Sequence, residues 1–211
     1  MDRTKFANYS SSSTAFQLKS EIVRKAIHFL IALSPSMAAI NRTATMLFLM
    51  VGTLGYALME YLRLSGVKIP VISSLTSMAS RPRDMGHFVM GPVTLGLGAL
   101  LALLMYPSPA AAIAIYALAF GDGVASLVGK VFGKLRPGFL FGKSVEGSLA
   151  CFAVVLASAY AVSGSLFISF IAAITATVIE ALPLEDYDNL LIPVTVGLVV
   201  QFASLSFFTF A

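Results

Sequence analysis

The sequence Gly121-Asp122-Gly123-Val124-Ala125-Ser126-Leu127-Val128-Gly129-Lys130-Val131-Phe132-Gly133-Lys134 decides how the rest of the chain is interpreted. A carboxylate interrupts an apolar run there, and cations, glycines and hydroxyls follow it. Small residues recur at every fourth position, which on a helix produces a stripe for close packing: Ala117, Gly121, Ala125, Gly129 and Gly133. Asp122, Ser126 and Lys130 form a polar strip beside that stripe. Because a charge at the end of a membrane helix is costly, Asp122 is predicted to belong to a functional site.

The composition indicates a membrane protein. Of the 211 residues, 58% are hydrophobic and 11% are charged, and the mean hydropathy is +0.89. A soluble domain carries about 25% charged residues. Runs long enough to span a bilayer are predicted at seven places: 22–40, 44–64, 88–106, 110–132, 145–162, 166–182 and 190–210. The predicted fold is all-α, one polytopic transmembrane domain over 1–211 with a polar cytoplasmic segment at 1–20.

The distribution of charge predicts the orientation. With seven spans, every one of the 14 Lys and Arg residues except Arg42 falls on the side of the N-terminus. Cytoplasmic loops are enriched in such residues, so the N-terminus is expected in the cytoplasm. The acidic residues fall on the same side, which places the polar chemistry where nucleotides are available. The lipid bilayer is an expected partner and nucleic acid is not.

The first polar motif is Glu21-x-x-Arg24-Lys25-x-x-His28. On a helix these four residues share one face at the start of the first span. An interfacial basic anchor would account for Arg24 and Lys25. It would not account for Glu21 or for His28, which lies two turns into the span. A face that binds a phosphate or orients a catalytic group remains the alternative.

The second motif, Gly142-Lys143-Ser144-Val145-Glu146-Gly147-Ser148, opens the fifth span. It ends like a P-loop, but Pro137 occupies the position of the required glycine and no strand is expected before it. Lys143 can still contact phosphate oxygens, while Ser144 and nearby N–H groups begin a helix, where anions bind. Glu146 is either a helix-dipole charge or, with Asp122, a ligand of Mg²⁺.

The third motif is the acidic stretch from Glu180 to Asn189, which opposes the basic trend of its side. A metal or counter-charge role suits it. Asp188 or Asn189 is expected to begin and cap the last span. For Asn189, capping the helix and contributing to a site are compatible.

Taken in order, these motifs resemble the CTP-dependent lipid-alcohol kinases, a family that includes dolichol kinase, phytol kinase and yeast-type diacylglycerol kinase. The resemblance rests on the first motif, Gly121-Asp122 with Ala125-Ser126 and Gly129, the Lys143–Ser148 motif, and Asp188-Asn189-x-x-Ile192-Pro193. It covers about residues 20 to 200. It implies transfer of the γ-phosphate of CTP, with ATP and UTP as alternatives, to the hydroxyl of a polyprenol, phytol, geranylgeraniol or diacylglycerol.

The resemblance also implies roles for individual residues. Asp122 is expected to be a Mg²⁺ ligand or base, with Lys143 and Lys130 on the triphosphate. Glu146 and Asp188 are expected as further metal or positioning carboxylates. Arg24, Lys25 and His28 are expected to hold the phosphate end or the acceptor hydroxyl. The other expected nucleotide contacts are Gly121, Ser126, Ser144, Ser148 and Asn189.

Two other functions stay open at this stage. One is a CTP:phosphatidate cytidylyltransferase, although the charged C-terminal signature expected of that family is missing from 201–211. The other is an ion-coupled transporter using Asp122, which would require polar residues in mid-span facing both sides. The predicted location is the plasma or inner membrane of a prokaryote, or the endoplasmic reticulum or plastid membrane of a eukaryote. The oligomeric state is left open.

Overall fold

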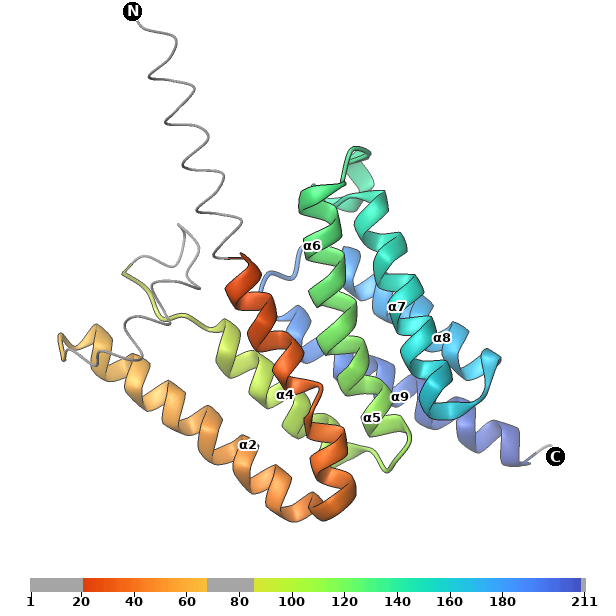
Figure 1. The fold of residues 1–211 in the computed structure, drawn as a ribbon, viewed down its shortest axis with the longest axis horizontal. Coiled ribbons are helices and arrows are strands. Elements are labelled where there is room, and N and C mark those ends of the chain that lie inside the picture. The colour runs from red at the N-terminus through yellow and green to blue at the C-terminus, as the bar shows by residue number, and fades with distance from the viewer. Residues whose placement is uncertain (1–20, 68–85, 210–211) are drawn as a thin grey trace, which may run out of the picture.

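The computed structural model describes residues 21–67 and 86–209, and within them the chain is helical without strands (Figure 1). The polar segment predicted at 1–20 lies outside the described residues. Residues 21–31 are helical. The remaining elements are α2 (Ser34–Leu64), α4 (Gly91–Met105), α5 (Ala110–Tyr116), the π-helix η2 (Ala117–Asp122), α6 (Gly123–Val131), the 3₁₀ turn η3 (Gly138–Leu140), α7 (Val145–Ser163), α8 (Leu166–Ala181) and α9 (Asp188–Thr209).

The structure supports a membrane protein but does not establish seven spans. Four helical stretches are long and apolar enough to cross a bilayer: Ser34–Leu64, Ala110–Val131, Val145–Ser163 and Asp188–Leu205. Helices α4 and α8 are apolar but shorter, at 15 and 16 residues. The number of spans and the cytoplasmic N-terminus therefore remain predictions.

The first two predicted spans form a hairpin whose breaks differ from the expected ones. The first span is interrupted at Ala32–Leu33, where the helix stops and α2 begins with Pro35 in its first turn. Pro35 lacks the N–H that would donate to the Ile31 carbonyl in a continuous helix, which is consistent with a break there. Asn41, between the two predicted spans, has non-helical φ/ψ of −151° and 101° inside α2. Figure 1 shows the chain reversing direction near this end of α2.

The fourth predicted span, 110–132, is one continuous helix. Helices α5, η2 and α6 follow one another from Ala110 to Val131, and the wider π turn occupies the middle. Gly123 permits a close approach there, because a Cβ at that position would lie 2.7 Å from the Phe29 ring. π turns inside α-helices are frequent at functional sites.

This central helix is surrounded by α4, α7, α8 and α9, and its π turn is almost completely buried. The predicted small-residue stripe packs against α7. A Cβ on Gly121 would lie 3.0 Å from Val155, and one on Gly129 would lie 3.0 Å from Ser144. The stripe therefore allows α6 and α7 to approach closely, as expected of small residues in membrane helices.

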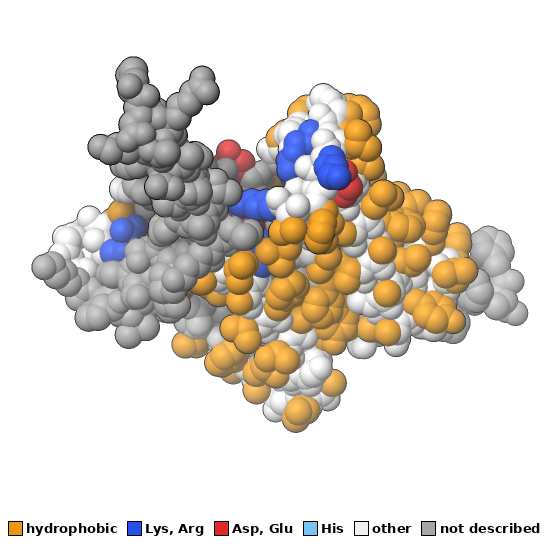
Figure 2. Space-filling model, turned by 45° about the horizontal axis from the view of Figure 1, so that its top comes forward, with side chains coloured by type: hydrophobic (Ala, Val, Ile, Leu, Met, Phe, Trp, Pro, Cys, Tyr) orange, Lys and Arg blue, Asp and Glu red, His pale blue; other side chains and the backbone are white. Residues whose placement is uncertain are grey.

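The surface of the bundle separates apolar from charged regions. On the face in Figure 2, hydrophobic side chains cover the lower part and the flank, while Lys, Arg, Asp and Glu gather in the upper half. Among the described cations, Arg42 is at the opposite end of α2 from Arg63 and binds the carbonyl oxygens of Leu103 and Tyr106. The charged end is where the candidate site lies.

Candidate active site

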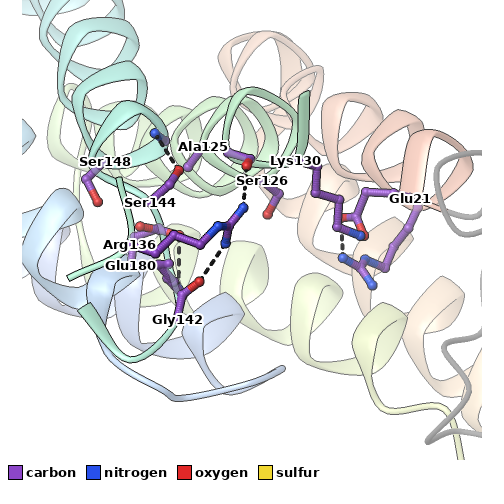
Figure 3. Close-up of a pocket in the computed structure, with 13 residues that line it drawn as sticks. Glu21, Ala125, Ser126, Lys130, Arg136, Gly142, Ser144, Ser148 and Glu180 are labelled. Carbon is purple, nitrogen blue, oxygen red and sulfur yellow. Dashed lines mark hydrogen bonds and ion pairs between the residues drawn. The ribbon is translucent and has the colours of Figure 1, made fainter. Parts of the chain in front are cut away.

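A cavity of about 220 Å³ opens where the first helix, α6, the α6–α7 loop, α7 and α8 meet (Figure 3). Four cations and two carboxylates line it, together with small and hydroxyl-bearing residues. The lining comprises Glu21, Arg24, Ala125, Ser126, Gly129, Lys130, Arg136, Gly142, Lys143, Ser144, Gly147, Ser148 and Glu180. The excess of positive charge suits a polyanionic ligand. The structure thus brings together the first two sequence motifs.

Glu21 joins the first helix to α6. Its carboxylate forms ion pairs with Arg24, one turn further along its own helix, and with Lys130 on α6. Burial raises the pKa of Glu21, but Arg24, Lys130 and Lys25 together outweigh burial and hold the pKa below its ordinary value. Glu21 is therefore ionised at neutral pH and organises two cations at the rim of the cavity.

A second polar cluster, formed by Lys25, His28 and Asp122, lies outside the lining of the cavity. Lys25 and Asp122 form an ion pair, and Nδ1 of His28 lies 3.2 Å from Oδ2 of Asp122. All three side chains are buried. Ser126 connects the cluster to the cavity, since it lines the cavity and its hydroxyl donates to Oδ1 of Asp122 at 3.3 Å.

The position of Asp122 differs from the expected one. Asp122 was expected at the end of a membrane helix, but it is the last residue of the π turn in the middle of the continuous 110–131 helix. It is 5% exposed and enclosed by Lys25, His28 and Ser126. Gly121 beside it packs against Val155 and Cys151, so its observed contacts are packing contacts.

The α6–α7 loop is held in shape by side-chain bonds to its backbone. The guanidinium of Arg136 donates to the carbonyl oxygens of Gly142 at 2.6 Å and Gly129 at 2.7 Å. The carboxylate of Glu146 accepts from the backbone N–H groups of Lys134 at 3.0 Å and Leu135 at 3.2 Å. Glu146 therefore fastens the loop, and it is not among the residues that line the cavity with Lys143.

Helix α7 begins at the cavity with a side-chain cap. The Ser144 hydroxyl accepts from the N–H of Gly147 at 3.1 Å, as expected for a residue that caps a helix N-terminus. Ser144 packs closely against α6 and the residues that follow it, since a Cβ on Gly129 would lie 3.0 Å and one on Gly133 would lie 2.6 Å from its hydroxyl oxygen. The N-terminus of α7 thus faces the cavity beside Lys143 and Ser148.

The structure adds Glu180 to the site, a residue that the sequence motifs left without a specific role. Glu180 lies near the end of α8, and its Oε1 is 3.0 Å from Nζ of Lys143. Glu180 lines the cavity although the residue is only 4% exposed. The sequence signal that could have identified Glu180 was its place at the start of the acidic stretch from Glu180 to Asn189.

Asp188 and Asn189 begin α9 as predicted, and both are buried. The Asn189 side-chain amide donates to the Thr94 hydroxyl at 3.0 Å and to the Gly91 carbonyl at 3.4 Å, which ties α9 to α4. Its Oδ1 has no hydrogen-bond partner among the described residues. Asp188 interacts electrostatically with Asp122, Lys25 and Lys143.

The three carboxylates proposed as metal ligands do not form one group. Within 21–67 and 86–209, no three His, Cys, Asp or Glu side chains lie close enough together to hold an ion. Glu146 is engaged by the loop backbone, whereas Asp188 and Asp122 are near enough to interact. Mg²⁺ is commonly held by one or two carboxylates and the substrate phosphates. Asp188 offers a carboxylate and Asn189 an Oδ1 without a partner among the described residues, although neither residue lines the cavity.

Comparisons with known proteins gave related sequences but no matching family model and no matching solved structure. An uncharacterized protein of Methanocaldococcus jannaschii is 26% identical over 86% of this chain and 93% of its own length. A probable chloroplastic phytol kinase of Triticum aestivum is 27% identical over 60% of this chain and 48% of its own. A CTP-dependent diacylglycerol kinase of Eremothecium gossypii is 28% identical over 66% of this chain and 45% of its own.

The chain spans about half the length of the two kinases that it matches. The identities are low, but both kinases have the activity class that the order of motifs suggested. These homologues support a relationship between this chain and the CTP-dependent lipid kinases.

Proposed function

We propose that the protein is a membrane-embedded kinase that transfers the γ-phosphate of CTP to the hydroxyl of a lipid alcohol. The observation that carries the proposal is the cavity, in which Arg24, Lys130, Arg136 and Lys143 surround the start of a helix at the charged end of an apolar bundle. Cations and a helix N-terminus together favour phosphate. The related lipid kinases supply the reaction class.

Phosphoryl transfer depends mainly on positioning and on neutralising charge. Lys143, Lys130 and Arg24 would contact the triphosphate, and the N–H groups at the start of α7 would add neutral donors. Gly129 and Gly147 let α6 and α7 pack closely, and both residues line the cavity that would hold the phosphates. Arg136, whose guanidinium already binds two carbonyl oxygens, would keep the loop around the nucleotide.

Mg²⁺ is the expected companion of the nucleotide, and the residues present fit it. Asp188 and Oδ1 of Asn189 would hold the ion, which when bound supplies neutralising charge to the β- and γ-phosphates. Asp122 would add negative charge nearby. Its carboxylate is oriented by Lys25, His28 and Ser126.

In the reaction, the oxygen of the lipid alcohol attacks the γ-phosphorus, the bond from that phosphorus to the β–γ bridging oxygen breaks, and CDP leaves. The hydroxyl proton passes to a carboxylate. Asp122 is one candidate, because Ser126 lines the cavity and donates to it and so provides a route for the proton. The lipid hydroxyl would approach from the bilayer to the charged end of the bundle.

The test gives purified protein Mg²⁺ and γ-labelled CTP with a panel of lipid alcohols and phosphatidate. Label in a lipid phosphate supports the kinase and names the acceptor. Label released as pyrophosphate with phosphatidate would instead indicate a cytidylyltransferase, and no transfer from CTP, ATP or UTP would refute the proposal. Lys143→Ala should lose turnover, whereas Lys134→Ala, an exposed cation of the same loop outside the cavity lining, should keep it.

A further inference from the structure

Two buried polar atoms in residues that line the cavity lack hydrogen-bond partners among the described residues. They are Oε2 of Glu180 on α8 and the hydroxyl oxygen of Ser148 on α7. A buried polar atom without a partner is costly, so such atoms in a native structure call for an explanation. Both residues line one cavity, so a ligand bound in that cavity is the candidate partner for these atoms.

The chemistry of the two side chains is complementary. An ionised carboxylate only accepts hydrogen bonds, whereas a serine hydroxyl can also donate one. The 3.0 Å contact between Glu180 Oε1 and Nζ of Lys143 fixes the orientation of the carboxyl group and leaves Oε2 without a partner among the described residues. Oε2 of Glu180 can therefore accept a hydrogen bond from a ligand, and the Ser148 hydroxyl can donate one to it.

We propose that Glu180 Oε2 and Ser148 Oγ form a subsite for one hydroxyl group of a substrate. A hydroxyl carries one donor and acceptor lone pairs, so it can donate to Glu180 while it accepts from Ser148. The proposal rests on the kinase function proposed above and refines it. The hydroxyl belongs either to the ribose of the nucleotide or to the acceptor alcohol, since both groups have this chemistry.

The same arrangement argues against other ligands at this corner of the cavity. A phosphate oxygen would be repelled by the Glu180 carboxylate, and it carries no hydrogen that it could donate to Oε2. A metal ion would meet the Lys143 ammonium there, because that group already pairs with the Glu180 carboxylate.

The variants that test the subsite are Glu180→Gln and Ser148→Ala. Ser158→Ala is the matched control on α7, because the Ser158 hydroxyl bonds the Val155 carbonyl and lies outside the cavity lining. Glu185→Gln is the charge control, because Glu185 is exposed and also outside that lining. If Glu180→Gln fails to fold, Ser148→Ala alone decides.

Two measurements separate the sources of the hydroxyl. Equilibrium binding compares CTP with 2′-deoxy-CTP and 3′-deoxy-CTP in the absence of acceptor. Steady-state kinetics give the KM for geranylgeraniol, the first acceptor probe, at saturating CTP. Loss of a hydrogen bond to a charged group is expected to weaken binding about 10-fold or more.

If the subsite binds the ribose, the wild-type protein prefers CTP over one deoxy analogue and both variants lose that preference. If it binds the acceptor, both variants raise the KM for geranylgeraniol about 10-fold and keep the wild-type nucleotide preference. Variants that match their controls in both measurements would overturn the subsite while leaving the kinase intact. A wild-type protein that neither binds CTP nor transfers phosphate would remove the proposed function and the subsite together.

Discussion

Neutralising one partner of the Lys25–Asp122 ion pair is expected to destabilise the helical bundle as well as to stop catalysis. Lys25 is 2% exposed and Asp122 is 5% exposed. Removing one partner of a buried pair leaves an uncompensated charge, which costs about 3–5 kcal/mol. At about 2–4 °C per kcal/mol for a chain of this size, the melting temperature should fall by about 6–20 °C.

The two single variants should differ. Asp122→Asn leaves the Lys25 ammonium buried without a carboxylate. Lys25→Met leaves Asp122 with the Ser126 hydroxyl and with His28 at 3.2 Å, and so should cost less. The double variant contains no unpaired charge and should recover much of the lost stability. It should still lack turnover, which separates the role of the pair in folding from its role in the reaction.

The chain provides its own probe for this measurement. Cys151 is the only cysteine in the sequence, and it is fully buried between α7 and the central helix. A thiol-reactive fluorogenic dye therefore reports unfolding in detergent, and labelled CTP reports turnover. Asp122→Asn melting within about 2 °C of the wild type, less than 1 kcal/mol on the same scale, would refute the coupling. A double variant no more stable than Asp122→Asn would refute it as well.

Two further perturbations test the packing and the rim of the cavity. Gly98→Ala places a Cβ 2.0 Å from the Asn189 carbonyl oxygen and should cost about 1–3 kcal/mol by overpacking. Gly52→Ala, inside α2 with nothing within 4 Å, should melt at or above the wild-type temperature in the same dye assay, because alanine favours a helix over glycine. Glu21 has a pKa below its ordinary value of 4.5, so its contribution to stability is present above that value and is lost as the pH falls through the native pKa. The melting temperature of Glu21→Gln should therefore fall less steeply than that of the wild type below about pH 4.5. Parallel plots of melting temperature against pH for the variant and the wild type would contradict this.

The later helices could be predicted from sequence to within a few residues. Spans expected at 145–162, 166–182 and 190–210 appear as Val145–Ser163, Leu166–Ala181 and Asp188–Thr209. Their apolar runs end at recognisable signals, such as Gly164, which has a positive φ of 65°. The break at Ala32–Leu33 was missed because a proline near the start of a helix and one inside a membrane helix are both tolerated.

The candidate site was predicted in its motifs but not in its partners. Six of the nine expected nucleotide contacts line one cavity, namely Arg24, Ser126, Lys130, Lys143, Ser144 and Ser148, whereas Lys25, Gly121 and Asn189 lie outside its lining. Nucleotide binding by these residues stays a prediction. Which carboxylate meets which cation could not be deduced, because these pairs join residues far apart in the chain. Lys143 pairs with Glu180 rather than with a carboxylate of its own motif, and Lys130 pairs with Glu21.

The π turn at Ala117–Asp122 explains how one helix serves both packing and chemistry. Residues four apart on a regular α-helix advance by about 400°, so a four-residue stripe drifts around the helix by about 40° per step. The wider π turn counteracts this drift at the step from Ala117 to Gly121. The stripe on the central helix therefore keeps facing α7 as far as Gly129. The same local widening sets Asp122 beside Lys25 and His28 on the first helix. The composition of Ala-Leu-Ala-Phe-Gly-Asp contains no signal for such a turn, so the position of Asp122 had to come from the structure.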